Sequence, residues 1–207
     1  MIAGVITIPE RVEPLGRLLD VVKPEVASVS VFCDDAHRGQ RWNYQRMFFA
    51  MLSNATGGEP VLLMTDDAIT VPGFRTMWER IHSKAKDSLY TLFGRQRHLF
   101  NAANLARGYV TKVQARGWYD PAAIFINQQS LPEEVSGWLE SGGREYMNDK
   151  RAKSANHFDL ILQEYLVFHK IPWTITTPTL FDHQCVASSL GHVIGRSPAY
   201  IGNANIR

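Results

Sequence analysis

Two pairs of adjacent aspartates each follow a run of apolar, strand-forming residues. One pair, Asp66 and Asp67, follows residues 61–65, and an equivalent pair follows residues 29–33. Carboxylate oxygens are ligands for hard divalent cations, which in turn bind phosphate. The pairs therefore predict a site for a metal ion and a phosphate. The alternative is that each pair only forms a turn, because Asp is also a common turn residue.

The segment between the two pairs predicts where they lie in the fold. Its apolar residues recur at the spacing of one helix face, and residues 54–60 then end the helix. These apolar residues are Tyr44, Met47, Phe48, Met51 and Leu52. A strand, a helix and a second strand of this length form a βαβ unit with parallel strands. Both aspartate pairs then lie at one edge of a sheet, where open α/β sheets bind ligands.

The other periodic segments predict an alternation of strands and helices. Further strands are expected at residues 2–8, 89–93, 109–113, 122–126 and 173–176. Helices are expected to carry Leu15 to Val22, Phe74 to Ile81, Leu131 to Leu139 and Phe158 to Leu166. Residues 94–98 read as an exposed basic loop, the polar segment 141–154 as a mobile loop, and the segment after Pro178 as irregular.

Composition places the chain among ordinary globular proteins. Its 207 residues are 45% hydrophobic and 20% charged, which suits a single domain with a substantial core. A net charge of +2 excludes a surface built throughout for polyanions. No apolar run approaches the ~20 residues that span a bilayer, and residues 1–11 lack the features of a signal peptide. Cys33 and Cys185 are therefore expected to be reduced, and the protein cytoplasmic.

Four segments, in this order, resemble GT-A-type glycosyltransferases of the small kind found in bacteria and bacteriophages. They are residues 4–11, 32–35 and 63–67, and residues 178–183 followed by 188–191. The resemblance implies an α/β fold with a Rossmann-type open, mostly parallel twisted sheet flanked by helices. It implies one domain over residues 1–207. Residues 1–110 would bind the nucleotide-sugar, and residues 111–207 would bind the acceptor and supply a metal ligand.

The resemblance implies a metal-dependent transferase that uses a nucleotide-sugar, first a UDP-sugar, with Mn²⁺ or Mg²⁺. Asp67 is the first candidate for a direct metal ligand, and Asp66 is the next, as a ligand or as a ribose contact. The family motif is often Asp-x-Asp, whereas here Thr65 takes the first position. His183 would be a further metal ligand, and its alternative is a structural histidine.

The nucleotide would contact residues near the ends of the first two strands. Asp34 and Asp35 could accept hydrogen bonds from ribose or uracil, although one of them could instead form a turn or helix cap. The other candidates are Thr7, Pro9, Arg11, Arg38 and Asn43. Arg11 could pair with the donor phosphate or base, or lie in a solvated helix start, and Asn43 could instead cap the helix that starts there.

Asp159 is the candidate general base for an inverting transfer, because it opens a helix and lies off its apolar face. It could equally be a first-turn carboxylate that stabilises the helix dipole, and His157 is a weaker candidate base.

The acceptor stays open between hydroxymethylated phage DNA, a protein and a glycan. Aromatic residues could stack on a sugar or a base, namely Trp118, Tyr119, Trp138 and Tyr146. A basic segment could follow a polyanion or be a solvated loop; its residues are Arg144, Lys150, Arg151 and Lys153. The family implies action in the cytoplasm of a bacterium or of a phage-infected host. A nucleotidyltransferase and a non-catalytic nucleotide- or sugar-binding domain are the alternative functions.

Overall fold

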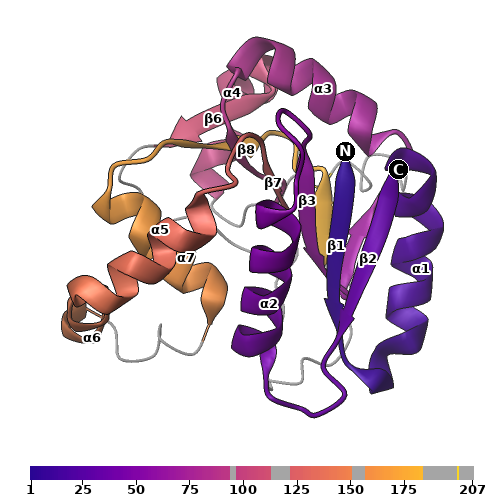
Figure 1. Cartoon of the computed structure of the whole chain (residues 1–207). Helices are drawn as coiled ribbons and strands as arrows, with labels where there is room; N and C mark the ends of the chain where they lie inside the picture. The colour runs from indigo at the N-terminus through magenta and orange to yellow at the C-terminus, as the bar shows by residue number, and fades with distance from the viewer. Residues whose placement is uncertain (94–96, 113–121, 151–156, 184–199, 201–207) are drawn as a thin grey trace.

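The chain forms a seven-stranded sheet with helices on both faces (Figure 1). The structure is a computed structural model, and it describes residues 1–93, 97–112, 122–150, 157–183 and 200. The strand order is β2-β1-β3-β7-β5-β8-β6. The strands are β1 (Ile2–Thr7), β2 (Ser28–Cys33), β3 (Val61–Thr65), β5 (Leu89–Thr91), β6 (Tyr109–Lys112), β7 (Ala122–Phe125) and β8 (Trp173–Thr176).

Most strands of this sheet point the same way. β1 is parallel to β2 and β3, whereas β7 is antiparallel to both β3 and β5, so that β5 shares the direction of β3. β8 is parallel to β5, and β6 is antiparallel to β8. Within the described residues, five of the seven strands therefore end at one edge of the sheet. The α/β fold class is confirmed, with a sheet that is mixed rather than purely parallel.

Helices cover the sheet in two layers (Figure 1). α1 (Val12–Val22) and α3 (Phe74–Ala85) pack on one face, whereas α2 (Gln40–Ser53), α5 (Leu131–Trp138) and α7 (Phe158–Phe168) pack on the other. Successive strand residues point to opposite faces, and Leu62 and Leu63 of β3 are both fully buried, one in each core. This double burial explains why β3 reads as a continuous apolar run.

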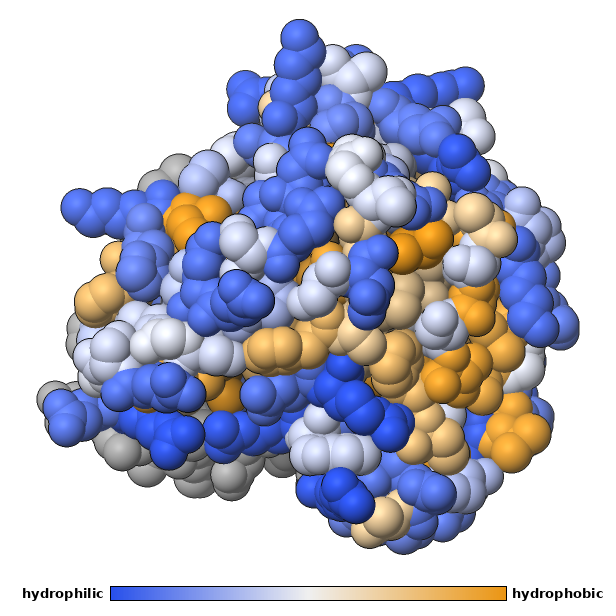
Figure 2. Space-filling model, in the orientation of Figure 1, coloured by the Kyte–Doolittle hydropathy of each residue, from blue (hydrophilic) through white to orange (hydrophobic). Residues whose placement is uncertain are grey.

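The predicted βαβ unit is confirmed over β2, α2 and β3. The apolar face of α2 is buried as its periodicity requires, and Phe48 contacts both Phe125 of the sheet and Phe158 of α7. The edge strand β2 is more open, with Val31 45% exposed. Figure 2 shows apolar atoms gathered on the side of the molecule where β2 and α1 lie.

Three parts of the fold differ from the sequence-based expectations. Residues 141–154 are not a loop throughout, because α6 (Arg144–Lys150) follows a π-helical turn at Leu139–Gly143 and buries Met147. α4 (Ala102–Arg107) and η3 (Arg97–Phe100) lie where no helix was expected. β4 (Ala68–Thr70) and β9 (Phe181–His183) form a second, two-stranded sheet.

Some predicted residues lie outside the described part of the chain. They are Trp118, Tyr119, Arg151, Lys153, Cys185 and the 188–191 segment. Among the residues that are described, no helix has the length and apolar character needed to cross a membrane.

Candidate functional site

The carboxyl ends of β1 and β3 bring Thr7 close to the aspartate pair Asp66 and Asp67. The Thr7 hydroxyl donates to Asp66 Oδ2 at 2.8 Å, and the Asp66 amide donates to the carbonyl of Ile6 at 3.1 Å. The Thr65 hydroxyl donates to Asp67 Oδ1 at 2.6 Å. Asp66 and Asp67 form the turn between β3 and β4, as the alternative interpretation expected, but both are buried and fixed by strand-end groups.

Arg11 supplies the positive charge that balances this pair. Its guanidinium Nη1 lies 2.8 Å from Asp66 Oδ1 and 3.6 Å from Asp67 Oδ2. Pro9 starts the short 3₁₀ turn Pro9–Arg11, and this turn carries Arg11 from the end of β1 to the aspartates. The sequence alone suggested a phosphate or base contact for Arg11, whereas the structure places it against both carboxylates.

The small second sheet brings His183 to the same place. β4 starts directly after Asp67 and pairs antiparallel with β9, so that Ala68 lies opposite His183. His183 Nδ1 is 3.6 Å from Asp67 Oδ2, and its ring packs edge-to-face against Phe93 after β5. Pairing of the three-residue strands β4 and β9 thus brings His183 beside Asp67, although the two residues are more than one hundred positions apart in the sequence.

The two aspartates differ in their electrostatic environment. Burial raises the pKa of Asp66, and the hydrogen bonds from Arg11 and Thr7 only partly offset it. Burial also acts to raise the pKa of Asp67, but His183, Thr65 and Arg11 together outweigh it and hold the pKa below its ordinary value. The Asp66 and Asp67 charges outweigh burial at Arg11 and raise its pKa. Asp67 therefore holds its negative charge to lower pH than Asp66 does, which makes it the better ligand for a cation.

The donor set at this edge offers part of a coordination shell for a divalent cation. Asp67 offers carboxylate oxygen, which binds Mn²⁺ or Mg²⁺, and His183 offers imidazole nitrogen, which suits a transition metal rather than Mg²⁺. A guanidinium nitrogen already lies between the two carboxylates, so their geometry holds a positive charge. In the described part of the chain, no group of three or more His, Cys, Asp or Glu side chains could hold a metal without help.

The aspartate pair after β2, Asp34 and Asp35, has different surroundings. Asp34 is buried, and its two carboxylate oxygens accept hydrogen bonds from the Arg38 and Gly39 amides at 2.9 and 2.7 Å. These bonds hold the loop that leads into α2, which is the turn role that the sequence left open. Asp35 is exposed beside it, so its carboxylate is accessible to a ligand.

Asn43 ties the ends of β1 and β2 together. Its side-chain amide donates to the carbonyls of Thr7 and Phe32, at 3.2 and 2.7 Å. The helix begins at Gln40, with Gly39 as its N-cap, so the idea that Asn43 caps the helix is wrong.

Arg38 lies on the loop before α2, close to Asn43 in the sequence. The Arg38 guanidinium packs over the Trp42 ring at 4.5 Å, and the Arg38 side chain is otherwise exposed. It can therefore turn toward an anionic ligand.

Asp159 lies in the first turn of α7, and that turn lies beside the start of α2. His157 Nδ1 is 3.3 Å from Gln40 Oε1 across these two helix starts. Because α2 starts just after the carboxyl end of β2, the half-buried Asp159 lies toward the same edge of the sheet as the aspartate pairs.

Sequence reasoning did not identify the roles of Thr65 and Phe93. Both position a candidate metal ligand, Thr65 by its bond to Asp67 and Phe93 by its contact with His183. Thr65 lies between four apolar strand residues and the two aspartates in the sequence. This position was the only feature of the sequence that could have indicated its contact with Asp67.

The comparisons with known proteins give similarity of fold at low identity. No protein-family model matches the sequence, and no curated protein matches it. The chain is structurally similar to GT-A glycosyltransferases. Glycosyltransferase GlyE of Streptococcus pneumoniae TIGR4 aligns in its apo form with a TM-score of 0.44 and 9% identity, over 80% of this chain and 42% of GlyE. A second GlyE structure aligns with a TM-score of 0.44 and 10% sequence identity, over 82% of this chain and 43% of GlyE.

A galactosyltransferase, LgtC in complex with donor and acceptor sugar analogs, aligns with a TM-score of 0.39 and 9% identity. That alignment covers 90% of this chain and 87% of LgtC. The chain spans less than half of the GlyE chains that it matches. At TM-scores below 0.5 these likenesses support no inference about function, which must come from the residues at the strand ends.

Proposed function

We propose that this chain is a metal-dependent glycosyltransferase that moves a sugar from a nucleotide-sugar to an acceptor hydroxyl. The observation that carries the proposal is the convergence of Asp66, Asp67, Arg11 and His183 where parallel strands end. Such edges are where open α/β sheets bind ligands. The resemblance of the sequence motifs to the glycosyltransferase family is the reason for proposing a nucleotide-sugar as the donor. It also makes uridine the first candidate for the nucleoside of that donor.

Asp67 and His183 would hold Mn²⁺ or Mg²⁺ in this proposal, with Asp66 as a further ligand or a ribose contact. A metal ion at this position would neutralise charge on the departing diphosphate. Arg11 would pair with a phosphate once a metal ion takes its place beside the carboxylates, because a guanidinium binds phosphate oxygens in a bidentate fork.

Asp34, Asp35 and Arg38 lie at the next strand end and would contact the nucleoside. The exposed Asp35 is the better candidate for a direct hydrogen bond, since the Asp34 oxygens already accept two backbone amides. Thr7, Pro9 and Asn43 would shape the floor of this part of the site, as Asn43 holds β1 and β2 together at their ends.

Asp159 would act as the general base of an inverting transfer. It would take the proton of the acceptor hydroxyl as that oxygen forms a bond to the anomeric carbon. The bond from that carbon to the diphosphate oxygen would break, and the nucleoside diphosphate would leave. The place of Asp159 at a helix start near the strand edge supports this role. We expect the reaction to take place in the cytoplasm of a bacterium or a phage-infected cell.

Donor hydrolysis tests the proposed class of reaction. Purified protein is incubated with a panel of nucleotide-sugars and Mn²⁺, and the released nucleotide is identified by chromatography. Release of a nucleoside diphosphate, abolished by EDTA, is the expected result. Pyrophosphate release would indicate a nucleotidyltransferase instead, and binding without any turnover would indicate a non-catalytic domain.

A further inference from the structure

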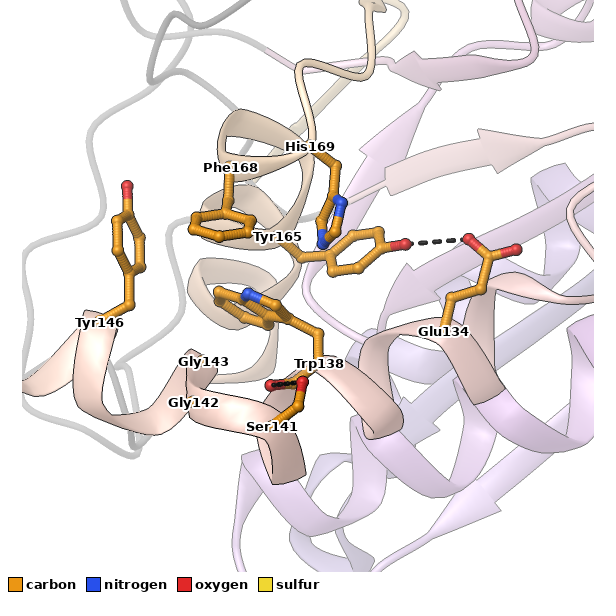
Figure 3. Close-up of a pocket in the computed structure, with 9 residues that line it drawn as sticks. All are labelled: Glu134, Trp138, Ser141, Gly142, Gly143, Tyr146, Tyr165, Phe168 and His169. Carbon is orange, nitrogen blue, oxygen red and sulfur yellow. Dashed lines mark hydrogen bonds between the residues drawn. The ribbon is translucent and has the colours of Figure 1, made fainter.

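A hollow lies between the C-terminal half of α7 and the segment that joins α5 to α6 (Figure 3). Its volume is about 470 Å³, within the ~300–1,000 Å³ range of small-molecule sites. In Figure 3 the rings of Trp138, Tyr146 and Phe168 gather at one end, and the carboxylate of Glu134 lies at the other. Three helices contribute these side chains, so the hollow forms only in the folded chain.

The aromatic end is a continuous wall rather than an open cage. The ring centroids of Tyr146 and Phe168 lie 5.1 Å apart, and those of Trp138 and Phe168 lie 5.8 Å apart. Trp138 and Tyr146 are separated by 6.1 Å. These are distances of direct ring contact, so no ammonium group fits between the rings. Phe168 is 49% exposed, and it offers apolar ring surface to a ligand.

The polar end carries a fixed carboxylate. The Tyr165 hydroxyl donates to Glu134 Oε2 at 2.9 Å, and the Ser130 hydroxyl donates to Oε1 at 2.6 Å. Hydrogen bonds from Ser130 and Tyr165 lower the pKa of Glu134, so it stays ionised. A carboxylate has about four acceptor positions, so two remain for a ligand. The exposed His169 ring packs at 4.5 Å on Tyr165 and adds a second hydrogen-bonding group.

The main chain at Gly143 closes the wall behind Trp138. A Cβ atom at this position would lie 2.5 Å from the Trp138 ring, which no side chain could tolerate without movement. The preceding Gly142 has φ +119° and lies at the kink inside the Leu139–Gly143 turn. The two glycines thus let the backbone approach the indole and fix the orientation of the ring.

We infer that this pocket binds one sugar ring of an oligosaccharide. A pyranose has an apolar C–H face, which matches the ring wall, and hydroxyl groups around its edge, which match the carboxylate and the imidazole. A fully apolar ligand would leave Glu134 without use for its remaining acceptor positions. A small cation would use the carboxylate but not the apolar wall formed by three touching rings.

The pocket is remote from the proposed site of transfer. Asp159 and Phe168 lie nine residues apart on α7, which corresponds to about 14 Å along a helix. The sugar in the pocket would therefore be a distal unit of a chain whose end reaches the strand edge. This assignment as an acceptor rests on the proposed function, and it selects a glycan among the acceptor classes that the sequence left open.

Saturation-transfer NMR with lactose, cellotriose and chitotriose tests the pocket directly. We expect saturation transfer to at least one of these sugars, with Phe168→Ala weakening binding about tenfold. Leu105→Ala, which removes an apolar side chain of similar exposure from α4, is the matched control and should leave affinity unchanged. No saturation transfer to any of the three sugars, or an equal loss in both variants, would overturn the inference.

A second ligand separates a sugar from a cation. Tetramethylammonium should fail to compete with the bound sugar, and Glu134→Gln should weaken sugar binding only severalfold, because the amide oxygen still accepts hydrogen bonds. Competition by tetramethylammonium, together with loss of its binding in Glu134→Gln, would contradict the sugar assignment.

The two proposals fail in different ways. Nucleotide binding with Mn²⁺ should persist in Phe168→Ala, because the pocket lies away from the strand ends. Sugar binding without any nucleotide binding would remove the proposed function and keep the pocket. Nucleotide binding without sugar binding would do the reverse.

Discussion

The strand-edge site and the aromatic pocket hold their side chains by different forces. At the strand edge, Asp66 and Asp67 are buried and balanced by Arg11, with each oxygen position fixed by a hydrogen bond or an ion pair. In the pocket, Trp138 and Phe168 are held by ring contacts, and only Glu134 carries a fixed charge. Buried charges without a partner are costly, so the first site should tolerate far less change than the second.

The largest effect is expected at Asp159, where α7 meets the strand edge. Asp159→Asn keeps the shape of the side chain but cannot accept the acceptor proton. The turnover number kcat should fall by ~10²–10⁴, the usual contribution of a general base, while donor affinity persists. Single-turnover rates and the melting temperature of the same variant are the measurements. A normal rate in a folded variant would remove Asp159 from the mechanism and point to a retaining reaction or to His157.

Asp67→Asn should be next in size. The substitution replaces a charged carboxylate with a neutral amide of equal shape, and nucleoside diphosphate binding with Mn²⁺ should weaken roughly 100-fold, about 2.7 kcal/mol. Calorimetry on the folded variant is the measurement. Asp20→Asn on the exposed side of α1 is the matched control, and it should bind as the parent does. Parent-like affinity in Asp67→Asn would rule out its role as a ligand.

Arg11→Gln should have opposite effects on metal and nucleotide. The guanidinium competes with a metal ion for Asp66 and Asp67, so removing it should tighten Mn²⁺ binding by about tenfold in the absence of nucleotide. Nucleoside diphosphate affinity should fall, since a phosphate contact is lost. Electron paramagnetic resonance reports free Mn²⁺, and Arg17→Gln, which breaks an exposed ion pair with Glu13, serves as the control. Weaker Mn²⁺ binding in Arg11→Gln would mean that Arg11 organises the aspartates instead of competing.

The smallest effect is expected from acid titration of Glu134. Its pKa is lowered in the folded chain, so the folded state binds fewer protons than the unfolded state as the carboxyl titrates. The stabilisation is present above the ordinary carboxyl pKa and is lost as pH falls through the lowered value. In Glu134→Gln, the free energy of unfolding should change less with pH in this range than it does in the parent protein. The difference should be only a few tenths of a kcal/mol, because the carboxylate is exposed. Urea unfolding at a series of pH values measures it, and an unchanged slope would contradict the lowering of the Glu134 pKa by the Ser130 and Tyr165 hydrogen bonds.

The parts of the fold that periodicity determines could be predicted from the sequence. The buried run of β3 and the helical face of α2 required parallel strands, and these placed both aspartate pairs at one edge. β4 and β9 could not be predicted in the same way, because each has only three residues and depends on pairing across more than 110 positions. α6 was missed because a polar segment with one buried methionine, Met147, has too weak a periodicity.

The candidate site was predictable in its residue types and not in its partners. Asp67 and His183 were paired only through a motif resemblance, whereas the β4–β9 ladder is what brings them to 3.6 Å. The ion pair of Arg11 with Asp66 and the backbone bonds of Asp34 depend on loop geometry that residue spacing does not encode. The aromatic pocket depends on the backbone at Gly142 and Gly143, and its Trp138 and Tyr146 had been noted only as possible stacking residues.

Calorimetric titration with UDP, in the presence of Mn²⁺ and again in EDTA, tests the central claim most directly. We expect binding with Mn²⁺ and a large loss in EDTA, because Asp67 and His183 need a metal ion to bind a diphosphate, and Arg11 stays with the aspartates without one. Replacing UDP by GDP, CDP or ADP should show one preferred nucleoside. Equal affinity with Mn²⁺ and with EDTA, for every nucleotide in the panel, would contradict a metal-dependent nucleotide-sugar site at this edge.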